Sequence, residues 1–221
     1  MTASTREAKG LSCRKGNFRA RGRVNAVAAQ SPFNNLADGL RYWCGALSFG
    51  APGEPPYPAP PAWISACIII LLGSYRRYYN FNDLFKTAIR PAHLAFAEAY
   101  WRDYTQSEGV LRNMPAPPAL LVEGFLDRYT ADLNSRFLRQ LAANSTTFWG
   151  YDSPTRFYYG LADEALHPNL VKMAIAADGP NIQGIPVKRA SHRGTFLASL
   201  YGDGTVIDDK STVPDWFKSL L

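Results

Sequence analysis

The sequence is poor in the residues that build metal and disulfide sites. It has only three cysteines, Cys13, Cys44 and Cys67, and their number is odd and their spacing matches no metal motif. We therefore expect reduced thiols in a non-oxidising compartment rather than disulfides, and no cysteine nucleophile. Only three histidines are present and none are paired at ligand spacing, so neither zinc nor another cofactor is predicted.

Long hydrophobic runs are also missing. The strongest, Ala62 to Leu72, has 11 residues, whereas a helix that spans a bilayer needs about 20. This run predicts a buried helix and no transmembrane segment. No apolar stretch follows the basic residues near Met1, so no secretory signal peptide is visible, and the localisation is expected to be cytoplasmic or is left unassigned.

The positive charge is concentrated at one end of the chain. Of the net charge of +6, all lies in residues 1–23, which hold seven basic residues and one acidic residue, leaving 17 of each elsewhere. This distribution argues against a nucleic-acid-binding domain and predicts a basic, disordered arm. The arm's composition is equally compatible with a transit peptide, with upstream sequence unrelated to the fold, and with solubilising disorder.

The most informative segment begins with a strand that leads to a carboxylate. Thr155 to Tyr159 is rich in β-prone residues, follows a proline and stops at a glycine. Asp163 comes three residues later, where a ligand or catalytic group lies in an open α/β sheet. Asn169 to Ala177 then has the apolar spacing of a helix with one buried face.

The same arrangement follows once more, with a histidine in place of the acid. Ile185 to Ala190 is predicted to be a strand, His192 follows it, and Gly194 opens a helix over Thr195 to Tyr201. One helix and one strand fit between the acid and the histidine, so both side chains should emerge at the same edge of a parallel sheet. An acid and a histidine in this order are the supporting members of a serine-hydrolase triad.

At these residues the chain resembles the α/β-hydrolase superfamily, in particular its esterase and lipase-like members with a lid. The matching segments are YYGLADEALHP, with Asp163 in the acid position, and ASHRGTF, with His192 in the base position. The resemblance implies a partial α/β-hydrolase fold with a mostly parallel sheet and an inserted helical lid. It also implies ester hydrolysis by Ser-His-Asp chemistry on a small-molecule ester or acyl substrate.

The expected organisation follows from this resemblance and from the helical middle of the chain. After the arm, a strand and a proline-rich loop occupy residues 24–61, a helical lid occupies 62–148, and an α/β portion with the acid and histidine occupies 149–221. An independent helical bundle is the alternative for the middle segment. The oligomeric state is left open.

The nucleophile is the component that the sequence does not supply clearly. The resemblance implies a G-x-S-x-G elbow, and this motif is absent; the nearest match is A-x-S-x-G around Ser48. Six prolines follow within Ala51 to Pro61, which excludes the helix that an elbow requires and favours a loop serine. Val24 to Pro32 instead looks like the sixth strand of the fold, so we expect this chain to begin just after the elbow and to be incomplete.

Two functional classes therefore remain at this stage. The chain is either a serine-type ester hydrolase or a non-catalytic remnant or binding module of the same fold. Glu164 is the reserve acid, expected to point away from the site, and His167 is expected to border the acid turn.

Overall fold

The computed structural model describes residues 24–50, 57–103, 108–126, 136–203, 207 and 209–221. The basic arm predicted over residues 1–23 lies outside this part of the chain. The described residues form two compact units, each treated by itself below. Residues 24–36, 57, 144–203, 207 and 209–221 form the sheet unit, and residues 37–50, 58–103, 108–126 and 136–143 form the helical unit.

The sheet unit is built on three parallel strands in the order β1-β2-β3. They are β1 (Val27–Gln30), β2 (Thr155–Gly160) and β3 (Ile182–Val187). In β2, five of the six residues are buried, as expected for a central parallel strand that is covered on both faces. The strands end together at one edge, so the loops that follow them gather there.

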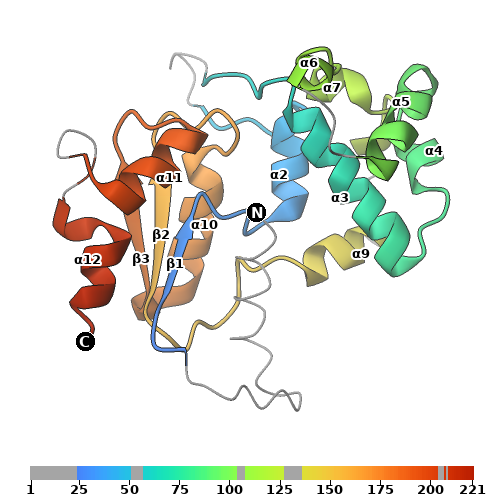
Figure 1. The fold of residues 1–221 in the computed structure, drawn as a ribbon. Helices are drawn as coiled ribbons and strands as arrows, with labels where there is room; N and C mark the ends of the chain where they lie inside the picture. Colours follow the sequence, from blue (N-terminus) through green and yellow to red (C-terminus); the bar gives the residue numbers. More distant parts are fainter. Residues whose placement is uncertain (1–23, 51–56, 104–107, 127–135, 204–206, 208) are drawn as a thin grey trace. The chain divides into compact units, whose positions relative to one another are not determined.

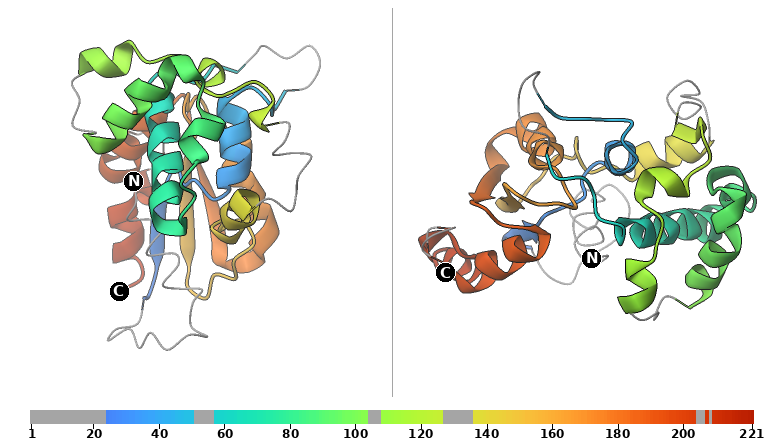
Figure 2. Two further views of the ribbon diagram at one scale, coloured as in Figure 1. Left: turned by 90° about the vertical axis from the view of Figure 1, so that its right-hand side faces the viewer. Right: turned by 90° about the horizontal axis from the view of Figure 1, so that it is seen from above.

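Helices cover both faces of this sheet (Figures 1 and 2). Because side chains alternate along a strand, Tyr158 of β2 faces a cluster that includes Ala198 of α11 (His192–Tyr201) and Val213 of α12 (Val213–Lys218). On the opposite face of the sheet, a Cβ atom at Gly184 of β3 would meet the side chain of Ile175 in α10 (Pro168–Asp178). Short 3-10 turns at Gly179–Asn181 and Asp209–Ser211 complete the unit. A parallel sheet between helices confirms the predicted α/β class.

The helical unit is organised around α3 (Ile64–Tyr79), which packs against α4 (Leu84–Ala88), α5 (Pro91–Arg102) and α7 (Pro117–Leu120). The apolar run predicted as a buried helix forms its first half, with Ile64, Ile68 and Leu72 fully buried. In the part of the chain that the structure describes, no helix is long and apolar enough to span a membrane. The other helices among the described residues of this unit are α2 (Leu36–Trp43), α6 (Glu108–Arg112) and α9 (Arg136–Ala143).

Two predicted elements have different bounds in the structure. The third strand starts at Ile182 and ends at Val187, and Arg189 adopts a left-handed conformation that turns the chain. The last predicted helix begins at His192 rather than after Gly194. In the helical unit, Leu121 forms an isolated antiparallel bridge with Ile89.

Candidate active site

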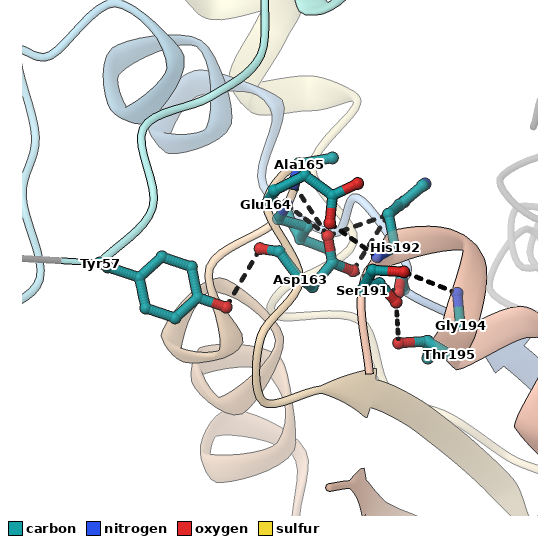
Figure 3. A network of polar contacts seen from close by, with 10 residues as sticks. Tyr57, Asp163, Glu164, Ala165, Ser191, His192, Gly194 and Thr195 are labelled. Carbon is teal, nitrogen blue, oxygen red and sulfur yellow. Dashed lines mark hydrogen bonds and ion pairs between the residues drawn. The ribbon is translucent and has the colours of Figure 1, made fainter. Parts of the chain in front are cut away.

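The acid turn is built around the buried carboxylate of Asp163. The residue is 1% exposed and follows the end of β2 by three positions. Its Oδ1 atom accepts hydrogen bonds from the backbone N–H groups of Ala165, at 3.0 Å, and Leu166, at 2.9 Å (Figure 3). These bonds shape the turn and supply part of the hydrogen bonding that a buried carboxylate requires.

The histidine is held at the start of α11. Ser191 caps this helix, since its Oγ accepts from the backbone N–H of Gly194 at 3.0 Å, and His192 is the first helical residue. The Nδ1 atom of His192 lies 3.0 Å from Oδ2 and 3.1 Å from Oδ1 of Asp163. The structure therefore brings the two sequence-predicted residues together at the carboxyl edge of the sheet (Figure 3).

Backbone hydrogen bonds join the acid turn to the chain that leads to the histidine. Leu161 N–H donates to the carbonyl of Val187 at 3.0 Å, and Ala162 N–H donates to that of Ala190 at 3.2 Å. The two loops thus extend the pairing of β2 with β3 beyond the strands. Their relative placement is fixed by the backbone and does not depend on the Asp163 side chain alone.

The sequence analysis expected Glu164 to point away from the site, and this expectation is wrong. Its Oε2 atom accepts a hydrogen bond from the backbone N–H of His192 at 3.1 Å (Figure 3). The first N–H groups of a helix have no partner within the helix, and a carboxylate is favoured at that end by the helix dipole. Glu164 therefore helps to fix the start of α11, and with it the backbone that carries the imidazole.

A second histidine borders the acid turn, as expected. His167 is buried, and its Nδ1 accepts from the backbone N–H of Asn169 at 3.2 Å, at the start of α10. The ring of Tyr57 packs against the imidazole of His167 at a tilted angle, with centroids 4.3 Å apart. The Tyr57 hydroxyl donates to the carbonyl of Asp163 at 3.1 Å. Burial and, to a lesser degree, the charge of Lys172 lower the pKa of His167 to about 4.

The lowered pKa of His167 predicts a pH-dependent stability. Because the unfolded chain binds this proton near pH 6.5 and the folded chain only near pH 4, stability is lost as pH falls through that window. We expect a loss of about 3 kcal/mol from this group between pH 7 and pH 4. Urea unfolding of wild type and His167→Asn at several pH values measures it. Asparagine keeps a helix-capping acceptor but does not titrate, so equal pH slopes for both proteins would contradict the prediction.

Sequence reasoning missed Ser31 as a member of this site. It follows β1 directly, and its Oγ donates to Oδ2 of Asp163 at 2.7 Å. A polar residue at the carboxyl end of a strand next to the acid strand is the signal that could have indicated it.

Ser48, the sequence-derived nucleophile candidate, lies in the helical unit. It is exposed, in a coil segment after α2, so a helix rather than a strand precedes it.

Burial raises the pKa of Cys44 to about 12 and that of Cys67 to about 11, which keeps both thiols protonated at neutral pH. Within the described residues, no three His, Cys, Asp or Glu side chains gather to hold a metal ion.

Comparison with solved structures identifies the fold. A "putative hydrolase" from Legionella pneumophila matches with a TM-score of 0.67 and 14% identity, over 88% of this chain and 50% of that one. A ligand-bound form of the rice cell wall degrading esterase LipA from Xanthomonas oryzae gives a TM-score of 0.66 at 14% identity, with the same coverages. Another LipA structure gives 0.62 at 16% identity, over 88% of this chain and 52% of that one.

These matches define the class of fold and show how much of the matched structures this chain covers. The chain shares its α/β fold with these hydrolase and esterase structures, and it spans about half the length of the solved structures that it matches. No family model matches the sequence, and no curated protein sequence matches it significantly. The resemblance is therefore one of fold, carried by structure rather than by sequence identity.

Proposed function

We propose that the sheet unit carries the acid and the base of a carboxylic ester hydrolase that works by Ser-His-Asp chemistry. The observation that carries the proposal is the 3.0 Å contact between His192 Nδ1 and Asp163 Oδ2. This contact lies at the carboxyl edge of a parallel sheet, in a fold shared with hydrolase and esterase structures. The esterase neighbours favour small-molecule esters as the substrate class.

The proposed roles follow from the geometry of the pair. Asp163 keeps the Nδ1 proton of His192 in place and stabilises the imidazolium, so Nε2 is the atom that takes the proton of an attacking serine. The serine oxygen adds to the ester carbonyl. The tetrahedral intermediate then collapses, the C–O bond to the leaving group breaks, and the imidazolium gives its proton to the departing alkoxide oxygen to form the alcohol. Water then repeats the sequence on the acyl-enzyme and releases the acid.

The nucleophilic serine has two candidate positions. Ser48 is the candidate within this chain. The alternative is a serine on a strand-to-helix turn in a segment outside this sequence, added to the sheet unit. In either case backbone N–H groups near that serine would stabilise the oxyanion.

The test compares the chain alone with the chain co-produced with the polypeptide encoded immediately upstream of it, using p-nitrophenyl butyrate. We expect the chain alone to hydrolyse the ester no faster than its His192→Ala variant. We expect the combined preparation to be active and to lose about 10⁴-fold in kcat in Asp163→Asn, which favours the wrong imidazole tautomer.

The outcomes separate the alternatives. Activity of the chain alone that disappears in both Ser48→Ala and His192→Ala would make Ser48 the nucleophile. An inactive combined preparation would contradict the proposed function and favour a non-catalytic remnant or binding module. Activity unaffected by the loss of His192 would exclude this pair from the chemistry.

A further inference from the structure

Ser31 occupies an unusual position at the end of β1. Its backbone N–H continues the strand pairing by donating to the carbonyl of Tyr158 at 2.8 Å. Its side chain is buried, at 5% exposure, and its hydroxyl donates to Asp163 Oδ2 at 2.7 Å across 132 positions of sequence. Ser31 therefore joins the carboxyl end of one strand to the acid that follows the neighbouring strand.

The backbone of Ser31 is strained where this contact is made. Its φ angle is 42°, in the left-handed region that residues other than glycine rarely adopt. It also precedes Pro32, and a residue before proline is normally driven to an extended conformation. Such a conformation persists only where the surroundings fix it, and it is found preferentially at functional sites. Here the strand pairing and the bond to Asp163 supply that constraint.

The contact also completes the restraint of the carboxylate. Oδ1 of Asp163 is held by two N–H groups of its own turn, at Ala165 and Leu166. Oδ2 is held by Ser31, from a different strand. With both oxygens tied, rotation about the Cβ–Cγ bond is opposed, and the carboxylate keeps its edge toward His192 Nδ1.

We propose that Ser31 is a positioning residue of the acid–histidine pair, whose hydroxyl fixes the Asp163 carboxylate against the Nδ1–H of His192. A role of Ser31 in catalysis rests on the proposed ester hydrolysis. The positioning itself is a property of this chain and requires no nucleophile or substrate. A nucleophilic serine would deliver its proton to the imidazole, whereas the Ser31 hydroxyl is directed at the acid.

The experiment is proton NMR of the His192 ring in the chain alone, with ¹⁵N-labelled histidine. Wild type should show a downfield Nδ1 proton that exchanges slowly with water. In Ser31→Ala and Ser31→Gly we expect this proton to exchange roughly tenfold faster, which is the effect of losing one charge-assisted hydrogen bond. Glycine tolerates the left-handed backbone, so its variant removes the hydroxyl without adding strain.

Ser153→Ala is the matched control, because Ser153 is also buried in the sheet unit but donates to the carbonyl of Val24. It should leave the Nδ1 proton unchanged. Unaltered exchange in both Ser31 variants would overturn the proposal. So would covalent labelling of Ser31 by a fluorophosphonate probe, since it would make Ser31 a nucleophile. Neither result depends on whether the chain hydrolyses esters, so failure here and failure of the proposed function are distinguishable.

Discussion

Replacing Asp163 with alanine is expected to lower the free energy of unfolding by about 4 kcal/mol. The substitution leaves the N–H groups of Ala165 and Leu166, the Ser31 hydroxyl and His192 Nδ1 without this acceptor. A buried donor without a partner costs about 1–3 kcal/mol, and the costs within one network do not simply add. Urea unfolding followed by circular dichroism measures the loss.

Two further variants show whether hydrogen bonding is the cause. Asp163→Asn keeps one oxygen for the turn amides and should lose only about 1–2 kcal/mol. Asp152→Ala, an exposed acid in the same unit, should stay within about 0.5 kcal/mol of wild type. If Asp163→Ala were as stable as Asp163→Asn, the four donors would have found other acceptors, and the carboxylate would not organise the turn.

The acid and the histidine could be placed from sequence because the signals are local. β-Prone residues, a stopping glycine and an acid three positions later lie within one short segment, and parallel strands put their carboxyl ends at a common edge. The structure places Asp163 after β2 and His192 after β3 accordingly. The N-cap serine before His192 is an equally local signal, and giving it weight would have set the start of α11 correctly.

The rest of the site could not be derived in this way. Ser31 meets Asp163 across 132 positions, and Tyr57 meets it across 106. The strand end at Ser31 indicates only the edge of the sheet at which its hydroxyl lies, not its partner, and no local signal indicates that Tyr57 lies near Asp163. At Ser31 the local preference even indicates the wrong backbone, since proline favours an extended residue before it and tertiary contacts impose a left-handed one. Glu164 was misplaced because its partner is the backbone N–H of His192, and the helix was expected to begin only after Gly194, so no helix N-terminus was expected at His192.

Substitution of Gly160 is expected to cause the second large loss of stability. It also links the packing of β2 to the geometry of Asp163 and His192. A Cβ atom at this last residue of β2 would overlap the Thr195 Oγ1 and the backbone carbonyl of Ala190. The hydroxyl could rotate away, but the carbonyl belongs to the backbone and already accepts from Ala162 N–H. We expect Gly160→Ala to destabilise the chain by about 3 kcal/mol, although alanine is normally preferred to glycine within a strand.

Two comparisons test this cause. Gly150→Ala, where the new Cβ would meet nothing within 4 Å, should change stability by less than about 0.5 kcal/mol. Adding Thr195→Ala to Gly160→Ala should restore only part of the loss, since the carbonyl of Ala190 remains in the way. Displacing that carbonyl breaks its bond to the acid turn, so the Nδ1 proton of His192 should exchange faster as well. Full recovery in the double variant would show that the side chain, and not the backbone, sets the approach of α11 to β2.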